Sequence, residues 1–363
     1  MKQLFILTSL FTLLWSSSTY SQDLHTKIDS IRNLYNVPEV TYAIITKDQI
    51  IKQGASGHHK FNEKNNTSNA SIQDYFHLGS NTKAITGFIA AKLVEQGKLT
   101  WETTFFDLFP ETKKDANPIY YNATLKDYFS HRAKVNAFTS GTERLSLPIF
   151  EGNKQQQRQA FAKHVLTLVP IESPDGYTYS NAGYSIAATM LEKVSNKSWE
   201  ELTKEFLTKD LGIEFVIGWP NRNLDNQPWG HALQYDVLES VPPTYNYQLS
   251  LIEPAGDLSM NIENYIKYIQ LNLKGLSGQS NTLSAKTYDF LFNSREKYAI
   301  GWGNLTTKEM KLYDHAGSDG TFFSYTQIDG LTNTAYIILA NSGTANAQQA
   351  VMKIVQEMKD SMK

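Results

Sequence analysis

The first regular pattern in the chain is helical, and a pair of strands follows it. Apolar residues recur at helical spacing over residues 24–34, and Val37-Pro38 closes this predicted helix. Two apolar runs, 40–45 and 50–51, then flank Lys47-Asp48, which is a candidate hairpin turn. The pattern therefore predicts one helix and two neighbouring strands in this part of the chain.

A helical period dominates the middle of the chain. From a start near Ser80, apolar residues share one helical face as far as Gly97, which is placed to end that helix. Another amphipathic helix is predicted over residues 186–194. Ser198 and Glu201 then form a capping box for the helix that follows.

Strand character returns towards the C-terminus, after a stretch that is mostly helical or irregular. The predicted strands are 298–302, 312–314, 321–328 and 334–339, and the terminal helix is 350–358. Strands at both ends with helices between them imply that the two ends meet in one sheet, with a helical lobe inserted. We therefore expect an α/β domain formed by residues 22–105 and 250–363, and a mainly helical domain formed by residues 106–249.

Composition narrows the classes of function. The 363 residues are 41% hydrophobic and 19% charged, which suits a globular protein. A formal net charge of −2 gives no strong field to attract phosphate backbones or anionic lipid, so we expect no nucleic-acid partner. Because the chain has no cysteine, it has no disulfide, no cysteine-ligated metal and no thiol nucleophile. We expect no metal and no cofactor, and any nucleophile must be an oxygen or an amine.

The first 21 residues have the pattern of a secretory signal peptide. Lys2 gives a positive start, an apolar run follows over residues 4–15, and residues 16–21 supply small side chains for cleavage. This run is too short to cross a bilayer, which takes about 20 residues. Cleavage after Ser21 predicts an exported protein, periplasmic or extracellular, without a stable membrane anchor. The alternative is a buried N-terminal helix.

The first motif with candidate chemistry is Ser80-Asn81-Thr82-Lys83. One helical turn brings the hydroxyl and the amine to the same face. A serine needs a neighbour that accepts its proton, and a lysine serves when a low dielectric holds part of it neutral. The start of a helix also offers N–H groups to an oxyanion. The alternative is a helix cap, and the same pattern recurs without a following apolar helix at Ser294 to Lys297.

The second motif is Tyr179-Ser180-Asn181, directly before the helix predicted over residues 186–194. A tyrosine near a lysine can donate or accept a proton, because a neighbouring cation lowers the pKa of the phenol. Asn181 offers an amide that can orient a substrate carbonyl. A packed aromatic residue beside a cap is the alternative, and Tyr120-Tyr121-Asn122 is a competing copy.

The third motif is His315-Ala316-Gly317-Ser318, between two predicted strands. A glycine there lets a ligand approach the backbone, and the following N–H can face an oxyanion. A structural histidine is the alternative for His315. His77-Leu78-Gly79 matches the pattern too, but it precedes the candidate nucleophile.

Taken in this order, the three motifs resemble those of the serine β-lactamase and penicillin-binding-protein superfamily. The branch most similar contains class C β-lactamases, family VIII esterases and D-amino-acid peptidases, and the likeness covers nearly all of the chain after the signal. The resemblance implies an antiparallel sheet flanked by helices, an inserted helical domain and a site in the groove between them. It implies no metal or other cofactor.

The resemblance also assigns roles to individual residues. Ser80 would be the acylated nucleophile, Lys83 its proton partner, and Tyr179 a base or proton relay. Substrate would be oriented by Asn181, His315, Gly317 and Ser318, with the backbone N–H groups of Ser80 and Ser318 forming the oxyanion hole.

Three departures from the family pattern bear on the substrate. His315 stands where many relatives have lysine, so a permanent charge is replaced by a group that is mostly neutral at pH 7. The usual His-Thr-Ser-Gly loop is replaced by residues 131–136, in which Arg132 or Lys134 would either contact an anion or lie on the surface. Asp257 takes the place of a glycine, and the sequence offers no interpretation of it.

The resulting prediction is a secreted serine hydrolase that cleaves an ester, a small amide or a D-amino-acid peptide. A class C-like β-lactamase is disfavoured by the neutral residue at position 315. A non-catalytic penicillin-binding or sensor module is disfavoured by the complete set of Ser80, Lys83 and Tyr179. A metal hydrolase based on His58-His59 is rejected, because neighbouring strand residues face opposite sides and no further ligand pattern follows. The oligomeric state is left open.

Overall fold

The apolar runs at the two ends of the chain form one seven-stranded antiparallel sheet. The computed structural model describes residues 24–61 and 68–363. The strand order is β2-β1-β12-β11-β10-β9-β8. The strands are β1 (Glu39–Thr46), β2 (Ile50–Gly57), β8 (Lys297–Tyr298), β9 (Gly303–Asn304), β10 (Leu312–Ser318), β11 (Phe323–Asp329) and β12 (Thr334–Ala340). Val40 pairs with Ala340 across β1 and β12, so the expectation that the chain ends meet in one antiparallel sheet is confirmed.

Both faces of this sheet are covered, as the apolar pattern of β12 requires. All seven residues of β12 are buried, and they alternate between two cores. Ile338 packs with residues 24–34, which are helical, and with α12 (Ala345–Asp360). Ile337 and Leu339 belong to the larger core on the other face. That core includes the buried sides of α2 (Thr82–Glu95), α10 (Ile262–Leu276) and α11 (Ala285–Asn293).

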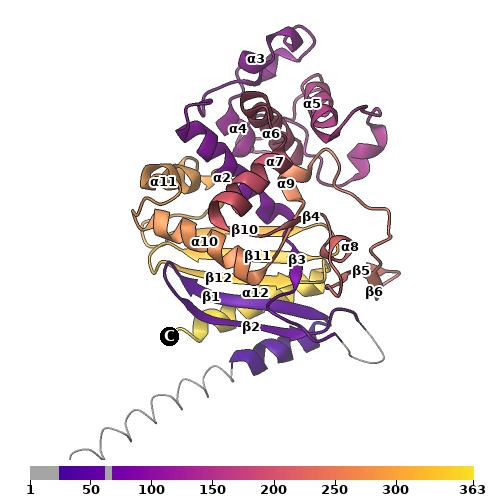
Figure 1. Cartoon of the computed structure of the whole chain (residues 1–363), viewed down its shortest axis with the longest axis vertical. Helices are drawn as coiled ribbons and strands as arrows, with labels where there is room; N and C mark the ends of the chain where they lie inside the picture. The colour runs from indigo at the N-terminus through magenta and orange to yellow at the C-terminus, as the bar shows by residue number, and fades with distance from the viewer. Residues whose placement is uncertain (1–23, 62–67) are drawn as a thin grey trace, which may run out of the picture.

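Short helices between the two ends stack beyond one edge of the sheet, at the top of Figure 1. They are α3 (Phe105–Leu108), α4 (Leu125–Phe129), α5 (Lys154–Val165), α6 (Asn181–Ser195) and α7 (Trp199–Thr203). The predicted capping box is present: the Ser198 hydroxyl accepts from the Glu201 N–H, and the Glu201 carboxylate accepts from the Ser198 N–H. Gly97 and Gly212, the predicted helix stops, both have positive φ.

The prediction that residues 106–249 are mainly helical missed three short strands. They are β4 (Val216–Ile217), β5 (Gly230–Gln234) and β6 (Val237–Val241). β4 joins a second sheet of order β3-β7-β4, with β3 (Tyr75–His77) and β7 (Leu258–Asn261). These strands lack a continuous apolar run, because most of their side chains are partly or fully exposed. The boundary of the helical domain at residue 249 stays a prediction.

The strand predicted over residues 298–302 is shorter than expected. β8 ends at Tyr298, and the chain turns through Gly301, whose φ is +77°, before β9 begins at Gly303. A β-carbon at Gly301 would meet Ala84 of α2. The turn therefore packs directly against the helix that follows the candidate nucleophile.

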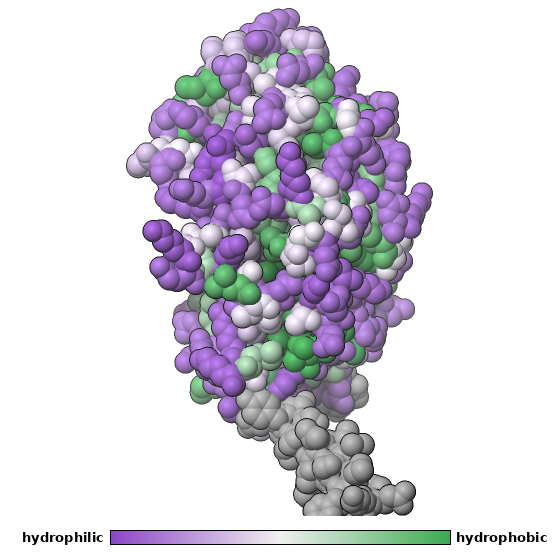
Figure 2. Space-filling model, turned by 90° about the vertical axis from the view of Figure 1, so that its left-hand side faces the viewer, coloured by the Kyte–Doolittle hydropathy of each residue, from purple (hydrophilic) through white to green (hydrophobic). Residues whose placement is uncertain are grey.

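Export cannot be read from the described part of the chain, because the predicted signal peptide at residues 1–21 lies outside it. Within the described residues, no helix is long and apolar enough to cross a membrane. Figure 2 shows a face on which hydrophilic residues predominate and hydrophobic residues form small separate patches.

Candidate active site

Ser80 lies in a single 3-10 turn, η1 (Gly79–Asn81), between β3 and α2. The turn is held by its neighbour Asn81, which is fully buried. The Asn81 amide donates to the Ser324 hydroxyl at 2.6 Å, and its carbonyl accepts from the Tyr265 hydroxyl at 3.0 Å. Ser324 in turn donates to the Leu78 carbonyl at 2.6 Å. The turn that carries Ser80 is thus fixed to β11 on one side and to α10 on the other.

Lys83, one helical turn after Ser80, is completely buried. Its Nζ lies 3.1 Å from the Ser80 hydroxyl, 2.7 Å from the Asn181 side-chain carbonyl and 2.9 Å from the Ala255 backbone carbonyl. Burial lowers the pKa of Lys83 well below its usual value. A neutral amine can donate to two of these acceptors and direct its lone pair at the Ser80 O–H. The geometry therefore fits a lysine that accepts the serine proton.

Tyr179 lies in the segment without regular secondary structure that directly precedes α6. Its ring lies 4.7 Å from Lys83 Nζ and 4.2 Å from the His131 ring. Desolvation raises the pKa of Tyr179, and a hydrogen bond with the Ser80 side chain opposes this effect. The expectation that a neighbouring cation lowers the pKa of this phenol is therefore wrong, because burial dominates; the phenol is protonated in the free protein and contacts the candidate nucleophile.

Asn181 begins α6, where Ser180 is the N-cap and accepts from the Gly183 N–H. The Asn181 amide donates to the Phe138 carbonyl at 2.9 Å, while its carbonyl accepts from Lys83. These two contacts fix which end of the amide faces the lysine. Asn181 thus connects the amine to the loop at residues 131–138.

His315, in β10, is buried and held in one tautomer. Its Nδ1–H donates to the Ala316 carbonyl at 2.8 Å, so Nε2 accepts from the Tyr298 hydroxyl, also at 2.8 Å. Burial, together with the charge of Lys83, lowers the pKa of His315 to about 3. His315 is therefore neutral at pH 7, and it does not supply the permanent positive charge that a lysine at this position would supply.

Gly317 and Ser318 lie against the nucleophile turn. A β-carbon at Gly317 would come 2.7 Å from the Ser80 backbone nitrogen and 2.8 Å from the Ser324 hydroxyl, and it would collide with the Leu78 carbonyl. A β-carbon at Gly79 would collide with the Ser318 backbone nitrogen. Two glycines therefore allow the backbones of η1 and β10 to approach closely, near both N–H groups expected to bind an oxyanion.

The two cations of the loop at residues 131–136, Arg132 and Lys134, make separate contacts and do not converge on one anion site. Lys134 pairs with Glu172 at 2.9 Å, and both side chains are well exposed. Arg132 donates to the backbone carbonyls of Ser130 and Glu296, each at 3.0 Å. These contacts support the alternative that Lys134 is a surface charge. The Arg132 guanidinium uses two of its N–H groups to bind backbone carbonyls.

Residues of the two competing motif copies, at 294–297 and 120–122, make contacts outside the candidate site. Lys297 pairs with Asp175 at 2.7 Å, and Ser294 caps the C-terminal end of α11. The Tyr120 hydroxyl donates to the Leu168 carbonyl at 3.3 Å. His77, which the sequence also singled out, does reach the site: its Nδ1 accepts from the Gly79 N–H at 3.3 Å.

Asp257, unexplained by the sequence, completes this second set of contacts behind Ser80. It lies 3.2 Å from His77 Nε2, directly after α9 (Glu253–Gly256). Burial lowers the pKa of His77, but Asp319 and then Asp257 outweigh this effect, so the pKa is raised overall. His77 Nε2 faces Asp257, while Asp319 lies 3.5 Å from Nδ1, the atom that faces the Gly79 N–H of η1.

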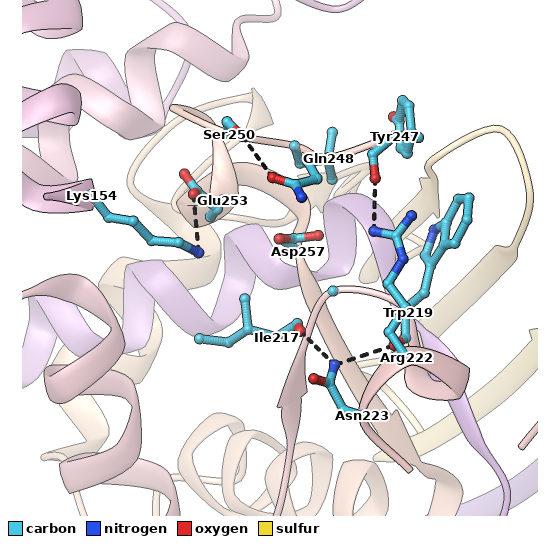
Figure 3. Close-up of a pocket in the computed structure, with 12 residues that line it drawn as sticks. Lys154, Ile217, Trp219, Arg222, Asn223, Tyr247, Gln248, Ser250, Glu253 and Asp257 are labelled. Atoms are coloured by element: carbon cyan, nitrogen blue, oxygen red, sulfur yellow. Dashed lines mark hydrogen bonds and ion pairs between the residues drawn. The ribbon is translucent and has the colours of Figure 1, made fainter. Parts of the chain in front are cut away.

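A pocket opens beside this cluster, with Asp257 near its centre (Figure 3). Trp219 and Arg222 form one wall, and the Arg222 guanidinium donates to the Tyr247 carbonyl at 2.7 Å. Lys154 and Glu253 form another, 3.4 Å apart. Gly256 precedes Asp257 in the chain, and a β-carbon at Gly256 would lie 3.8 Å from Gly79 of the nucleophile turn. The pocket therefore adjoins the nucleophile turn. The sequence did not predict this pocket.

Two further groups that position the site are not apparent in the sequence. Tyr298 donates to His315 Nε2, and the Ala255 carbonyl accepts from Lys83. A tyrosine within a predicted strand gives no indication of such a contact, and a backbone carbonyl leaves no trace in the sequence.

Known proteins were compared with the chain and its fold. A family model described as Beta-lactamase matches residues 25–357. "Protein flp" of Staphylococcus aureus (strain MRSA252) is 21% identical over 346 residues, covering 93% of this chain and 65% of that protein. "Penicillin-binding protein 4" of Amycolatopsis lactamdurans is 20% identical over 338 residues, covering 88% and 85%. The D-amino acid amidase from Ochrobactrum anthropi SV3, solved with L-phenylalanine amide, superimposes with a TM-score of 0.72 at 17% identity, covering 94% and 100%. The chain thus spans about 65% of the length of the first of these curated relatives.

Proposed function

The chain belongs to the Beta-lactamase family, whose members include serine hydrolases, and on this premise we propose that it hydrolyses an ester or amide through an acyl-enzyme on Ser80. The observation that carries the proposal is the buried amine of Lys83, 3.1 Å from the Ser80 hydroxyl. A buried amine with a lowered pKa is a base at neutral pH, which is what a serine nucleophile needs.

The first half-reaction follows from these contacts. The Ser80 hydroxyl passes its proton to Lys83 as its oxygen attacks the substrate carbonyl. The backbone N–H groups of Ser80 and Ser318 receive the oxyanion, where donors of this kind contribute about 10²–10³ in rate. Tyr179, which contacts Ser80, relays the proton to the departing alcohol or amine. The products are an ester on Ser80 and a protonated leaving group.

The second half-reaction reverses the roles. Water attacks the ester carbonyl on Ser80 and gives its proton to the neutral amine of Lys83, either directly or through the Tyr179 hydroxyl, which donates one proton as it accepts another. The proton then returns to the Ser80 oxygen when the C–O bond breaks, which releases the carboxylic acid. Asn181 keeps the lysine oriented throughout, because its carbonyl accepts from Nζ at 2.7 Å.

The neutral His315 limits the substrate class. A lysine in place of His315, as the family pattern has it, would carry a positive charge that attracts a carboxylate. His315 has a pKa of about 3 and is uncharged at pH 7. We therefore place esters, small amides and D-amino-acid peptides before β-lactams. The likeness to a D-amino acid amidase supports an amide of an amino acid within this class. The pattern of residues 1–21 supports export to the periplasm or the exterior.

Covalent labelling tests the proposal directly. The purified protein is treated with a fluorophosphonate probe, and the labelled peptide is identified by mass spectrometry. We expect the label on Ser80, its loss in Ser80→Ala, and its retention in Ser294→Ala, which alters the competing motif copy. A folded protein that is not labelled at Ser80 would instead be a non-catalytic binding module.

Substrate comparison tests the ranking. Hydrolysis of p-nitrophenyl butyrate, D-amino acid amides, D-Ala-D-Ala peptides and nitrocefin is measured under the same conditions. We expect the ester or the amides to have the highest kcat/KM. Turnover of nitrocefin well above that of the ester would identify the protein as a β-lactamase.

A further inference from the structure

His59, from the histidine pair that gave no metal motif in the sequence, lies in a buried cluster with two carboxylates. Glu39 begins β1, His59 follows β2, and Asp74 directly precedes β3. Their exposed fractions are 0%, 3% and 5%. One potential ligand atom from each residue lies within 4.8 Å of those of the other two. We propose that Glu39, His59 and Asp74 form a binding site for a single Zn²⁺ ion, separate from the serine site.

The carboxylate of Glu39 carries this inference, because it is buried without a donor. Neither of its oxygens accepts a hydrogen bond from an N–H group or a hydroxyl of the described residues, and its one side-chain partner is the Asp74 carboxyl, which together with burial raises the pKa of Glu39. A buried carboxylate in this state is costly unless a cation or a proton compensates it. The neighbouring Asp74 carboxylate adds to the cost, since two like charges at close range repel each other. A divalent cation between them removes both penalties.

Arg32 is the cation whose charge acts on Glu39, yet its donors are used elsewhere. Its Nε donates to Asp29 and to Ser56 at 3.1 Å. Its Nη1 donates to the carbonyls of Val37 and Pro38, and its Nη2 donates to side chains of residues 29 and 33. All five guanidinium N–H groups are thus accounted for, and none of them serves Glu39.

The contact between His59 and Asp74 also fits shared coordination. His59 Nε2 lies 3.1 Å from an Asp74 oxygen, yet this nitrogen makes no hydrogen bond. A spacing of this size is compatible with two ligands of one Zn²⁺ ion, whose bonds to nitrogen and oxygen are about 2.0–2.2 Å. The same oxygen of Asp74 accepts from the Ser71 N–H at 2.6 Å, which fixes the direction of the carboxylate.

The backbone around the cluster is held in place without a metal. Asn341, which is fully buried, accepts from the Glu39 N–H at 2.7 Å and donates to the His59 carbonyl at 3.1 Å. His59 also receives a hydrogen bond from the Trp229 N–H at 3.1 Å. One asparagine therefore fixes the positions of two of the three ligands, which preorganises the site.

The donor set and the surroundings select zinc. One imidazole nitrogen with two carboxylate oxygens suits Zn²⁺, whereas Mg²⁺ and Ca²⁺ prefer oxygen ligands alone. Three protein ligands leave a fourth position for water. A surface pocket of about 300 Å³, whose lining includes His59 and Asp225, gives the ion a path from solvent. Because the ligands come from three segments, the ion would tie β1, the end of β2 and the start of β3 together.

Metal binding by the untagged protein tests this site. After EDTA treatment and dialysis, the protein is titrated with ZnCl₂ by calorimetry, and bound zinc is counted by elemental analysis. We expect one Zn²⁺ per chain and a rise in Tm on binding. Glu39→Gln and His59→Gln should each weaken binding by about 100-fold or more, since loss of even an outer-shell partner costs about 10–100-fold.

His58→Gln is the matched control, because it alters the adjacent histidine outside the cluster. It should keep the affinity of the unaltered protein. Fluorophosphonate labelling of Ser80 and circular dichroism verify that each variant is folded. Absence of zinc binding by the folded parent, equal binding by all three variants, or binding of Ca²⁺ or Mg²⁺ in preference to Zn²⁺ would each overturn the assignment.

Discussion

Two glycines near the nucleophile turn, Gly317 and Gly256, differ in the space they leave for a side chain. At Gly317, a β-carbon would lie 2.7 Å from the Ser80 nitrogen and 2.8 Å from the Ser324 hydroxyl. At Gly256, it would lie 3.6 Å from Leu249 and 3.8 Å from Gly79, which is ordinary contact. Because unstrained contacts are at about 3.5–4.0 Å, Gly317→Ala must separate β10 from η1 by about 1 Å. Gly256→Ala needs no such movement.

The expected effects of Gly317→Ala follow from that displacement. Overpacking of this kind costs about 1–3 kcal/mol, which lowers the Tm by about 1–4 °C in a protein of this size. A displacement of about 1 Å at the reacting group costs about 10²-fold in rate, so kcat/KM for p-nitrophenyl butyrate should fall by about that factor. Gly256→Ala should change the Tm and kcat/KM by far less.

Differential scanning calorimetry and initial-rate kinetics on both variants measure these quantities. The rate of Ser80 labelling by a fluorophosphonate separates acylation from substrate binding. If Gly317→Ala hydrolyses the ester at the rate of Gly256→Ala, close approach of β10 to η1 is not needed for catalysis. The proposed oxyanion hole would then be wrong.

Four further outcomes are expected. Tyr179→Phe should lower kcat by about 10²-fold or more, and an unchanged kcat would remove this residue from proton transfer. The ascending limb of the kcat/KM profile against pH should report Lys83 and lie below the usual pKa of lysine, because burial lowers it. Lys134→Gln should change kcat/KM for a carboxylate-bearing ester by less than about twofold, because Lys134 pairs with Glu172 at the surface. Burial lowers the pKa of His231 to about 4, so between pH 6.5 and about 4 only the unfolded chain takes up a proton at this residue. The free energy of unfolding of the parent protein, compared with that of His231→Gln, should therefore fall as the pH falls through this range. Urea titrations in which the difference between the two proteins is the same at all pH values would contradict this.

The sequence predicted the strands and helices whose periodicity is set by burial on one or both faces. The runs at residues 40–45 and 334–339 became the neighbouring strands β1 and β12 of the large sheet, and nearly every residue in them is buried. The strands β4, β5 and β6 escaped prediction because their residues are mostly partly exposed, so no apolar pattern marks them. The partner of β4 lies far along the chain, with Ser259 opposite Val216, whereas β5 and β6 pair with each other as a hairpin.

The candidate site divides in the same way. Ser80 and Lys83 could be predicted to meet, because three residues in a helical turn fix their geometry. That Tyr179 lies beside them could be predicted only from the resemblance to a known family, because about one hundred residues of chain separate Tyr179 from Ser80. The Ala255 carbonyl could not be predicted at all, because backbone atoms carry no sequence identity. The sequence drew attention to His59 but not to Glu39 or Asp74, because each of these carboxylates alone is an ordinary residue beside a strand and only the fold brings the three together.

The four residues of α9 show how the fold supplies what the motifs lack. The Glu253 carboxylate lies 3.4 Å from Lys154 and 3.7 Å from Arg158, a buried residue that also pairs with Glu200 of α7. Two positions later, the Ala255 carbonyl accepts from Lys83, and the next residue packs on the nucleophile turn. The ion cluster therefore fixes one of the three acceptors that surround the lysine. Because loss of one partner leaves a buried charge uncompensated, a change in this cluster would disturb the proton acceptor of Ser80 without touching it.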